Sequence, residues 1–371
     1  MRADSMRGKQ YTAELLRKLV DIPSVFPNEE EALLFLEREL AALGLKPRRI
    51  DVEERRFNLL CRIGNGPVRV CLNAHIDTVS PSGGSLPQSR IDGDILYGLG
   101  ACDDKASIAA IVTAGLEIAS RQDEIDIGVD ILISVDEEYN ARGVESAIRQ
   151  GYKCDYAIVG EPTGLDLVRV HNGLLWIELA TSGVAAHGSS PWVGANAIDR
   201  MMEVVRDLRD CISGFPPPPI TGPMSLNLGT ISGGDLPNRV PENCKAVVDI
   251  RLVPPVTLHD ARNATAPALE SREWLRYTYG KSRECLSTAE DSPLVAALTG
   301  AVEDIGVMSK IIGMRGWTEA EAFATLLGID AVVCGPGSMA QAHSSNEFVK
   351  KSETQLAAEL YVKTVEKLAG K

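Results

Sequence analysis

The 371-residue sequence lacks the features that mark membrane proteins and disulfide-rich secreted proteins. It has no run of about 20 apolar residues, which a membrane-spanning helix requires. Residues 1–10 contain no apolar core, so we expect no secretory signal. The eight cysteines are scattered and none belongs to a C-x-x-C pair, which favours buried, reduced thiols over a disulfide framework. These absences favour a cytoplasmic protein.

Basic residues are also scarce. Lys and Arg total 38 against 51 Asp and Glu, which gives a formal net charge of −13, and no basic run is present. Such a balance repels a phosphate backbone, so we expect neither nucleic acid nor an anionic membrane surface as a partner. The hydrophobic fraction of 44% is ordinary for a globular protein, and the length suggests two or three domains. Histidine is rare enough to weigh each one: His75, His171, His187, His259 and His343.

Strand-like and helical segments alternate along the N-terminal half of the chain. A helix is expected after Asn28, which is a suitable N-cap, and a second, buried helix at 106–118. Such alternation with strands predicts a mixed, mostly parallel sheet with helices on both faces, an α/β fold. The expected strands are 68–72, 129–135 and 156–159.

The middle third has a different order of elements. Residues 174–285 read as β-α-β-β-α-β, which is the ferredoxin-like α+β pattern. We interpret this stretch as a domain inserted into the first one, so that residues 1–173 and 286–371 form a single discontinuous domain. The latter segment resumes the earlier pattern, with helices expected at 293–305 and 353–368 and a strand at 331–334.

Polar motifs follow the predicted strands at the point where each strand ends. His75-Ile76-Asp77 follows the first strand, Asp136-Glu137-Glu138 the second and Glu161 the third. Ligands of open α/β sheets bind at this edge, so we expect these side chains to converge. Each motif alone also has an ordinary explanation. The acidic triplet could be a solvated loop, Asp103 or Asp104 a helix cap, and His343 a loop histidine.

As a set, the motifs favour metal chemistry. Residues i and i+2 of an extended segment point the same way, so Asp77 is placed to orient a metal-binding His75. Three adjacent acids repel each other unless a cation or hydrogen-bond donors balance them. Imidazole and carboxylate ligands without thiolates suit Zn, Co or Mn. Two such ions about 3.5–4 Å apart would share a bridging carboxylate.

In order along the chain, five motifs resemble those of the co-catalytic zinc metallopeptidase family. This family includes acetylornithine deacetylase, succinyl-diaminopimelate desuccinylase, aminoacylase and carboxypeptidase G. The resemblance covers nearly the whole chain, includes the inserted domain and implies a zinc-exopeptidase-like fold. The motifs are His75-Ile76-Asp77-Thr78-Val79, Gly98 to Lys105, Asp136-Glu137-Glu138, Gly160-Glu161-Pro162-Thr163 and Ala342-His343 to Glu347.

The resemblance implies two divalent metal ions, Zn in the first place and Co or Mn as alternatives. His75 and Glu161 would bind one ion, and Glu138 and His343 the other. Asp103 would bridge the two ions.

It also implies roles around the ions. Asp77 would orient His75, and Glu137 would act as general base and then general acid. His187 in the inserted domain would steady the oxyanion in the site of a partner subunit, which implies a homodimer formed through that domain.

The implied reaction is hydrolysis of the amide bond of a small N-acyl amino acid. Asn238, Arg251 and Gly337 are the expected substrate-binding residues, and an arginine can hold a substrate carboxylate with a bidentate fork. The run from Cys334 to His343 favours an acetylornithine-deacetylase-like enzyme. The alternatives on the same site are a succinyl-diaminopimelate desuccinylase, an acetyl-lysine deacetylase, and a dipeptidase or carboxypeptidase. An alternative of another class is a non-catalytic scaffold that binds amino acids.

Some residues depart from the family pattern or have no place in it. Leu99 stands where the family usually has Arg, Ala106 where it often has Gly, and Glu319 where Asp is usual. None of these departures removes a proposed ligand. His171 and His259 match no catalytic role, and we expect them to be ordinary hinge or surface histidines.

Overall fold

The computed structural model describes residues 2–81 and 88–370, with side chains from residue 10 onward. The chain divides into two compact units. The larger unit comprises Met1–Arg169, Thr288–Ile312 and Thr318–Lys371, and the smaller unit comprises Val170–Ser287 and Gly313–Trp317. The smaller unit therefore extends beyond residues 174–285 at both ends and includes a short segment from the C-terminal part of the chain.

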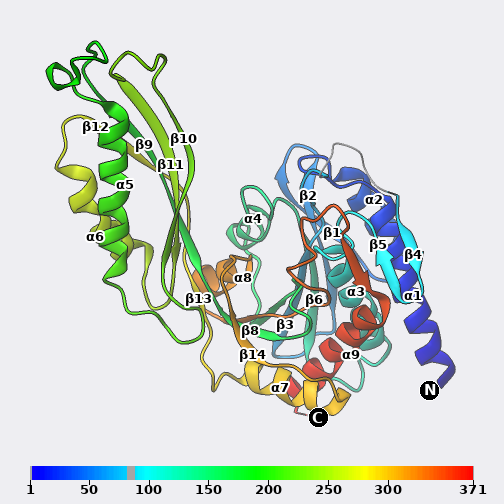
Figure 1. Cartoon of the computed structure of the whole chain (residues 1–371). Coiled ribbons are helices and arrows are strands. Elements are labelled where there is room, and N and C mark those ends of the chain that lie inside the picture. The colour runs from blue at the N-terminus through cyan, green and yellow to red at the C-terminus, as the bar shows by residue number, and fades with distance from the viewer. Residues whose placement is uncertain (1, 82–87, 371) are drawn as a thin grey trace. The chain divides into compact units, whose positions relative to one another are not determined.

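The main sheet is mixed, with parallel strands at its centre (Figure 1). Strands β6, β3, β7 and β15 lie side by side and parallel, which confirms the expected mostly parallel core. The strands β1 and β2 on one side and β8 and β13 on the other run antiparallel to their neighbours. The order is β1 (Arg48–Glu53), β2 (Arg56–Ile63), β6 (Gly128–Ser134), β3 (Arg69–His75), β7 (Tyr156–Val159), β15 (Asp330–Val333), β8 (Leu167–His171) and β13 (Leu286–Ser287), with β14 (Ile311–Met314) paired to β8.

Helices cover both faces of the sheet in the larger unit (Figure 1). One face packs against α3, which contacts α1 and α9, and α9 in turn contacts α7. The short helices α4 and α8 lie on the other face. The helices of this unit are α1 (Arg2–Asp21), α2 (Glu30–Ala42), α3 (Lys105–Ser120), α4 (Gly143–Arg149), α7 (Pro293–Ile305), α8 (Ala320–Ala322) and α9 (Lys351–Leu368), and a π-helical turn follows α8 at Phe323–Leu327.

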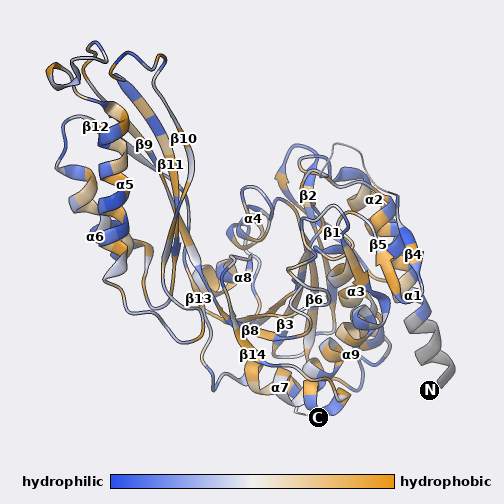
Figure 2. Cartoon of the chain, viewed as in Figure 1, coloured by the Kyte–Doolittle hydropathy of each residue, from blue (hydrophilic) through white to orange (hydrophobic). Residues whose placement is uncertain are grey.

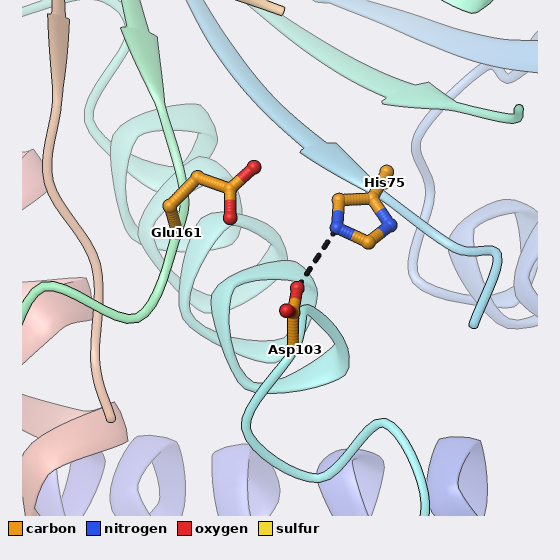
Figure 3. Close-up of side chains that lie close together, drawn as sticks. All are labelled: His75, Asp103 and Glu161. Atoms are coloured by element: carbon orange, nitrogen blue, oxygen red, sulfur yellow. Dashed lines mark hydrogen bonds and ion pairs between the residues drawn. The ribbon is translucent and has the colours of Figure 1, made fainter. Parts of the chain in front are cut away.

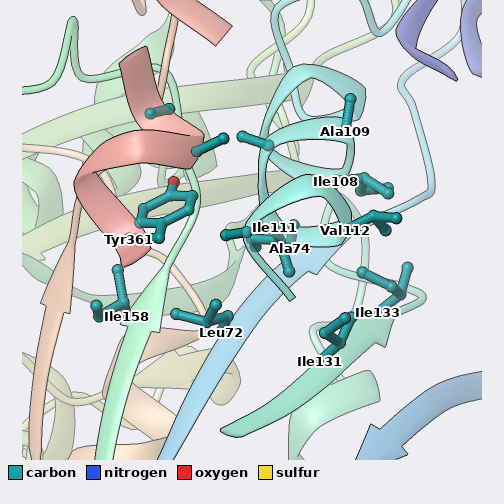
Figure 4. Packing of buried hydrophobic residues seen from close by; sticks show 14 of the residues in the cluster. Leu72, Ala74, Ile108, Ala109, Ile111, Val112, Ile131, Ile133, Ile158 and Tyr361 are labelled. Carbon is teal, nitrogen blue, oxygen red and sulfur yellow. The ribbon is translucent and has the colours of Figure 1, made fainter. Parts of the chain in front are cut away.

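Alternate residues of the central strands form the core beneath α3 and α9 (Figure 4). Leu72 and Ala74 of β3 and Ile131 and Ile133 of β6 belong to this cluster, whereas Asn73 and His75 point to the opposite face. Helix α3 is buried along most of its length, so its first turn and the loop before it are fixed against the sheet. Alternate residues of the central strands thus face the apolar core, and the residues between them, which include His75, face the other side of the sheet.

The predicted N-cap of α2 is wrong. The helix begins at Glu30, with Glu29 in the N-cap position and no side-chain cap hydrogen bond. Asn28 instead closes a turn through its backbone N–H, which donates to Val25 O at 2.8 Å. The Glu29 carboxylate is buried in an ion pair with Arg56, a tertiary contact that the local sequence pattern did not reveal.

A second, three-stranded sheet in the larger unit was not expected from the sequence. It consists of β16 (Phe348–Lys350), β5 (Ile95–Tyr97) and β4 (Arg90–Asp92), all antiparallel. Each strand has only three residues, which is too short for a recognisable alternating pattern.

The smaller unit has the expected ferredoxin-like order. It contains β9 (Gly173–Ser182), α5 (Ala197–Ser213), β10 (Ser225–Gly233), β11 (Asn243–Leu252), α6 (Leu258–Glu270) and β12 (Leu275–Arg283), and its antiparallel sheet has the order β10-β11-β9-β12. Helix α5 is amphipathic, as its mixed colouring in Figure 2 shows, and it buries Met201, Val204 and Leu208. Asn196 caps α5 by accepting hydrogen bonds from the backbone N–H groups of Ile198 and Asp199. Within the described residues, no helix is long and apolar enough to cross a membrane.

Candidate metal centre

The polar residues that follow the central strands converge at one edge of the main sheet. His75 is the last residue of β3, Glu138 follows β6 and Glu161 follows β7. Because β6, β3 and β7 are parallel neighbours, their carboxyl ends bring these side chains together. Asp103 reaches the same place from the loop before α3, and His343 from the loop between β15 and β16.

One group of possible ligands is buried and consists of His75, Asp103 and Glu161 (Figure 3). Their donor atoms all lie within 4.8 Å of one another. The Nε2 atom of His75 lies 3.0 Å from Asp103 Oδ1, and all three residues are at most 6% exposed. Such a cluster of an imidazole and two carboxylates fits a divalent cation.

A second group shares Asp103 with the first and adds Glu138 and His343. The Nε2 atom of His343 lies 2.9 Å from Glu138 Oε1 and 3.4 Å from Asp103 Oδ2. The two carboxylate oxygens of Asp103 therefore face different histidines, as a bridging ligand requires. Across both groups the donors are imidazole nitrogens and carboxylate oxygens, a set that fits Zn and similar divalent ions.

Hydrogen bonds fix the orientation of the His75 ring in the first donor group. Its Nδ1 atom lies 3.0 Å from the backbone carbonyl of Asp77, which only accepts, so Nδ1 is the donor in the neutral ring. The lone pair of Nε2 then points toward the Asp103 carboxylate, where a cation would lie between them. The Asp77 carboxylate is farther from Nδ1, at 3.6 Å, so the backbone rather than the side chain of Asp77 makes the shorter contact.

The Asp77 carboxylate holds the acidic loop after β6. It accepts hydrogen bonds from the backbone N–H groups of Glu137 at 3.2 Å and Glu138 at 3.0 Å. Burial tends to raise the pKa of Asp77, but His75 and these two amides outweigh it and hold the pKa below its ordinary value. An ionised Asp77 thus links the His75 loop to the loop that contains both glutamates.

Glu137 belongs to neither ligand group, although it is adjacent to Glu138. Burial raises the pKa of the Glu137 carboxyl well above its ordinary value. Attraction to His75 lowers the pKa, and repulsion by Glu138 and Glu319 raises it. A carboxyl with a raised pKa near a cation site can accept a proton and return it, as general acid–base catalysis requires.

An ionic network beneath this loop was not predicted from the sequence. Asp136 has a left-handed backbone conformation with φ of 68°, and its carboxylate accepts hydrogen bonds from Arg142 at 2.7 Å and Asn140 at 3.0 Å. Arg56 lies 3.4 Å from Asp136 and also pairs with the buried Glu29. Asn140 and Arg142 are close to Asp136 in the sequence, but Arg56 and Glu29 come from two separate segments, so no local motif could have identified the whole network.

Glu319 is a buried carboxyl behind the same loop. It accepts hydrogen bonds from the Ser134 hydroxyl, at the end of β6, and from the backbone N–H of Val144 at 3.1 Å. Burial raises the pKa of Glu319 from 4.5 to about 7, although these two hydrogen bonds lower it. The residue noted as a departure from the family pattern thus connects β6, α4 and α8.

We expect Glu319→Gln to remove a pH dependence of stability in the metal-free protein. The folded state binds the Glu319 proton more tightly than the unfolded state does, so the free energy of unfolding falls as pH rises from 4.5 to about 7. The stability difference between the wild type and Glu319→Gln should therefore change by about 3 kcal/mol across this range, in favour of the variant at high pH. Urea unfolding with chelator at pH 4.5, 6 and 8 measures the difference, and parallel curves for the two proteins would contradict the assignment.

The remaining predicted residues are distributed over both units. His187 and Asn238 lie on neighbouring loops of the smaller unit, where Gly188 N donates to Asn238 O at 2.7 Å. In the same unit, Arg251 donates to Asp249 Oδ2 at 3.0 Å. Gly337 lies in the larger unit with φ of 88°, and its N–H donates to Glu353 at 3.0 Å. Their parts in catalysis or substrate binding stay predictions.

His171 and His259 belong to neither ligand group. His259 is exposed on α6 and contacts Asn263 at 2.9 Å, as a surface histidine would. His171 is not a surface residue: it is fully buried in β8, and its Nδ1 lies 3.0 Å from the carbonyl of Asn172.

The fold and the paired donor groups define a class, the metal-dependent hydrolases with an α/β core and an inserted α+β unit. Residues 71–367 match the family described as peptidase family M20/M25/M40, and the chain belongs to this family. It is a hydrolytic enzyme that acts on amides.

A sequence relative agrees with this placement, and two solved structures agree with the fold. The acetylornithine deacetylase of Proteus mirabilis is 32% identical over an alignment of 378 positions, which covers 95% of this chain and 95% of the other. The structure of an M20 family metallo-carboxypeptidase from Sulfolobus solfataricus matches with a TM-score of 0.83 and 19% identity, covering 97% of this chain and 99% of the other. A dinuclear metal-binding M20 peptidase from Bacillus subtilis matches with a TM-score of 0.73 and 14% identity, covering 98% and 99%.

Proposed function

We propose that the protein removes the acyl group from a small N-acyl amino acid, with acetylornithine as the first candidate substrate and two divalent ions, Zn in the first place, as cofactors. The observation that carries the proposal is the position of Asp103, whose two carboxylate oxygens face His75 and His343 in two overlapping donor groups. The choice of an acetylated amino acid rests on the 32% identity to an acetylornithine deacetylase over nearly the full length of both chains.

Two divalent cations, which the donor groups of His75, Asp103 and Glu161 and of Asp103, Glu138 and His343 would hold, would lower the pKa of a water molecule in the site to about 7. Glu137 would take a proton from this water as its oxygen forms a bond to the amide carbon. Glu137 would then pass the proton to the amide nitrogen as the carbon–nitrogen bond breaks. The immediate products are a carboxylic acid, which loses the second proton of the water to become a carboxylate, and a free amino acid, and Glu137 returns to its ionised state.

The substrate is tested by an activity panel. The assay compares metal-free protein with protein reloaded with Zn or Co. The substrates are acetylornithine, succinyl-diaminopimelate, acetyl-lysine and a set of dipeptides, and the released amine is measured. We expect the highest kcat/KM with acetylornithine and no turnover in excess chelator. Faster turnover of dipeptides would favour a dipeptidase or carboxypeptidase, and tight binding of acyl amino acids without hydrolysis would contradict the proposed deacylation.

The contacts of His187 at Nδ1 favour the tautomer that donates a hydrogen bond through Nε2. The backbone N–H of Ser189 donates to His187 Nδ1 at 3.2 Å, and the Ser189 hydroxyl lies 2.8 Å from the same atom. Because Nδ1 accepts, the neutral ring carries its proton on Nε2. This form suits the stabilisation of an oxyanion, the role that we propose for His187 in the site of a partner subunit.

Mixing two inactive variants tests whether His187 acts across a dimer. His187→Ala and Glu137→Gln subunits are unfolded together and refolded, and the mixture is assayed. If His187 serves the partner's site, mixed dimers contain one complete site, and about a quarter of the wild-type activity is expected because half of the dimers are mixed. Activity no higher than the mean of the two variants would contradict a role across subunits.

A further inference from the structure

The loop that carries His343 and the loop that carries Asp103 are joined by one carboxylate. Glu347 is 4% exposed, and its side chain accepts three backbone hydrogen bonds from the Asp103 loop. Oε1 accepts from Cys102 N at 2.8 Å and from Asp103 N at 2.9 Å, and Oε2 accepts from Gly100 N at 2.8 Å. We infer that Glu347 is a positioning residue, which holds Asp103 and His343 in place and thereby sets the metal affinity of the centre.

The backbone of Glu347 and of the residue after it also contacts the segment before Asp103. Its carbonyl accepts from Gly98 N at 3.1 Å, and the next residue, Phe348, pairs with Tyr97 in the β16–β5 ladder. Backbone contacts thus join the two loops at Tyr97 and Gly98. The Glu347 carboxylate continues the contact as far as Asp103. One of the three donors is the N–H of Asp103 itself, so a shift of this carboxylate moves the backbone of the shared ligand.

The Asp103 loop depends on such an external acceptor because of its shape. Gly100 has a φ of 74°, in the left-handed region, and a Cβ there would lie 2.6 Å from the Thr78 side chain. A loop in this conformation turns its N–H groups toward one point, and Glu347 supplies the acceptor there. Charged acceptors form stronger hydrogen bonds than neutral ones, so an amide at position 347 is an imperfect replacement.

The inference rests on the proposed metal centre, and its test measures metal binding directly. Glu347→Gln keeps the size of the side chain but places an NH2 group against at least one of the three N–H donors. Residues that orient metal ligands typically change metal affinity by about 10–100-fold when they are replaced. We therefore expect Zn or Co, titrated into the metal-free variant against a chromogenic chelator, to bind about 10–100-fold more weakly than in the wild type.

Asp155→Asn is the matched control. The Asp155 carboxylate also accepts a backbone hydrogen bond, from Arg69 N at 2.7 Å, but at the opposite end of β3 from His75. Its metal affinity should equal that of the wild type. Urea unfolding of each metal-free variant shows whether the substitution instead lowers the stability of the whole protein. If Glu347→Gln does not fold, Glu347→Asp replaces it, because the shorter carboxylate cannot reach all three donors.

Weaker metal binding with an unchanged unfolding midpoint in the metal-free state supports a positioning role. Unchanged metal affinity overturns it, and so does a loss of affinity that is matched by destabilisation of the metal-free protein, since the residue is then only structural. A wild-type protein that binds no divalent ion would instead contradict the proposed function.

Discussion

Replacing Glu137 with glutamine is expected to lower kcat by about 10²–10⁴-fold, the usual contribution of a general base, while both cations stay bound. The side chain belongs to neither donor group, and the hydrogen bond from its backbone N–H to Asp77 does not depend on it. Glutamine has nearly the same shape but cannot accept a proton. Measurement of kcat together with the metal content per chain checks both parts of the expectation.

Glu138→Gln is the matched control, because it makes the same chemical change one residue along the chain. Glu138 lies 2.9 Å from His343 Nε2 in the second donor group, so its replacement should reduce metal occupancy as well as activity. The assignment of Glu137 as the base is wrong if Glu137→Gln keeps wild-type turnover. It is also wrong if Glu137→Gln loses metal to the same extent as Glu138→Gln, since Glu137 would then act as a ligand.

The sequence predicted the part of the site that depends on strands. The strand at 156–159 was predicted to the residue, and His75 and Glu161 follow from the rule that ligands lie at the carboxyl ends of parallel strands. Apolar runs of this kind are bounded by clear breaks, so both the strand and its end can be read locally. Asp103 and His343 lie in longer loops whose paths the strand pattern does not fix, so the residues alone left a helix cap and a loop histidine open as alternatives.

Long-range polar contacts could not be predicted. Glu347 and Gly100 are 247 positions apart, and nothing in either segment indicates that one accepts a hydrogen bond from the other. Likewise, nothing in the sequence around Arg56 indicates that it forms ion pairs with both Glu29 and Asp136. A charged residue in a sequence usually indicates a solvated surface. Only the tertiary structure shows which few are buried and paired.

Asn28 illustrates the opposite error, a local rule that tertiary structure overrode. Asparagine is a common N-cap, but the chain turns at Val25–Asn28 and the helix starts two residues later. Glu29 then occupies the cap position with its side chain committed to Arg56. The contact between Glu29 and Arg56 joins segments 27 residues apart, so the local pattern around Asn28 could not reveal the boundary.

Replacing Asp103 with asparagine is expected to impair both cation sites at once, because it is the only residue common to the two donor groups found among the described residues. An asparagine side chain has one ligand oxygen in place of two and carries no charge, so it cannot bridge. We expect metal affinity to fall by more than about 100-fold, the upper end for residues that only orient a ligand. Activity should fall with it. Equilibrium dialysis followed by metal analysis measures the number of ions retained.

His343→Ala separates the loss of one site from the loss of both. His343 is half-exposed and belongs to one donor group only, so the site of His75, Asp103 and Glu161 should still bind an ion. Metal binding stabilises a folded protein by RT ln(1 + [L]/Kd), which is about 2.7 kcal/mol per site at 100 times Kd. At such a concentration the wild type should gain about twice the stabilisation of His343→Ala, and Asp103→Asn almost none. If Asp103→Asn keeps the full stabilisation of the wild type, Asp103 does not bridge the two groups, and each ion must be held without it.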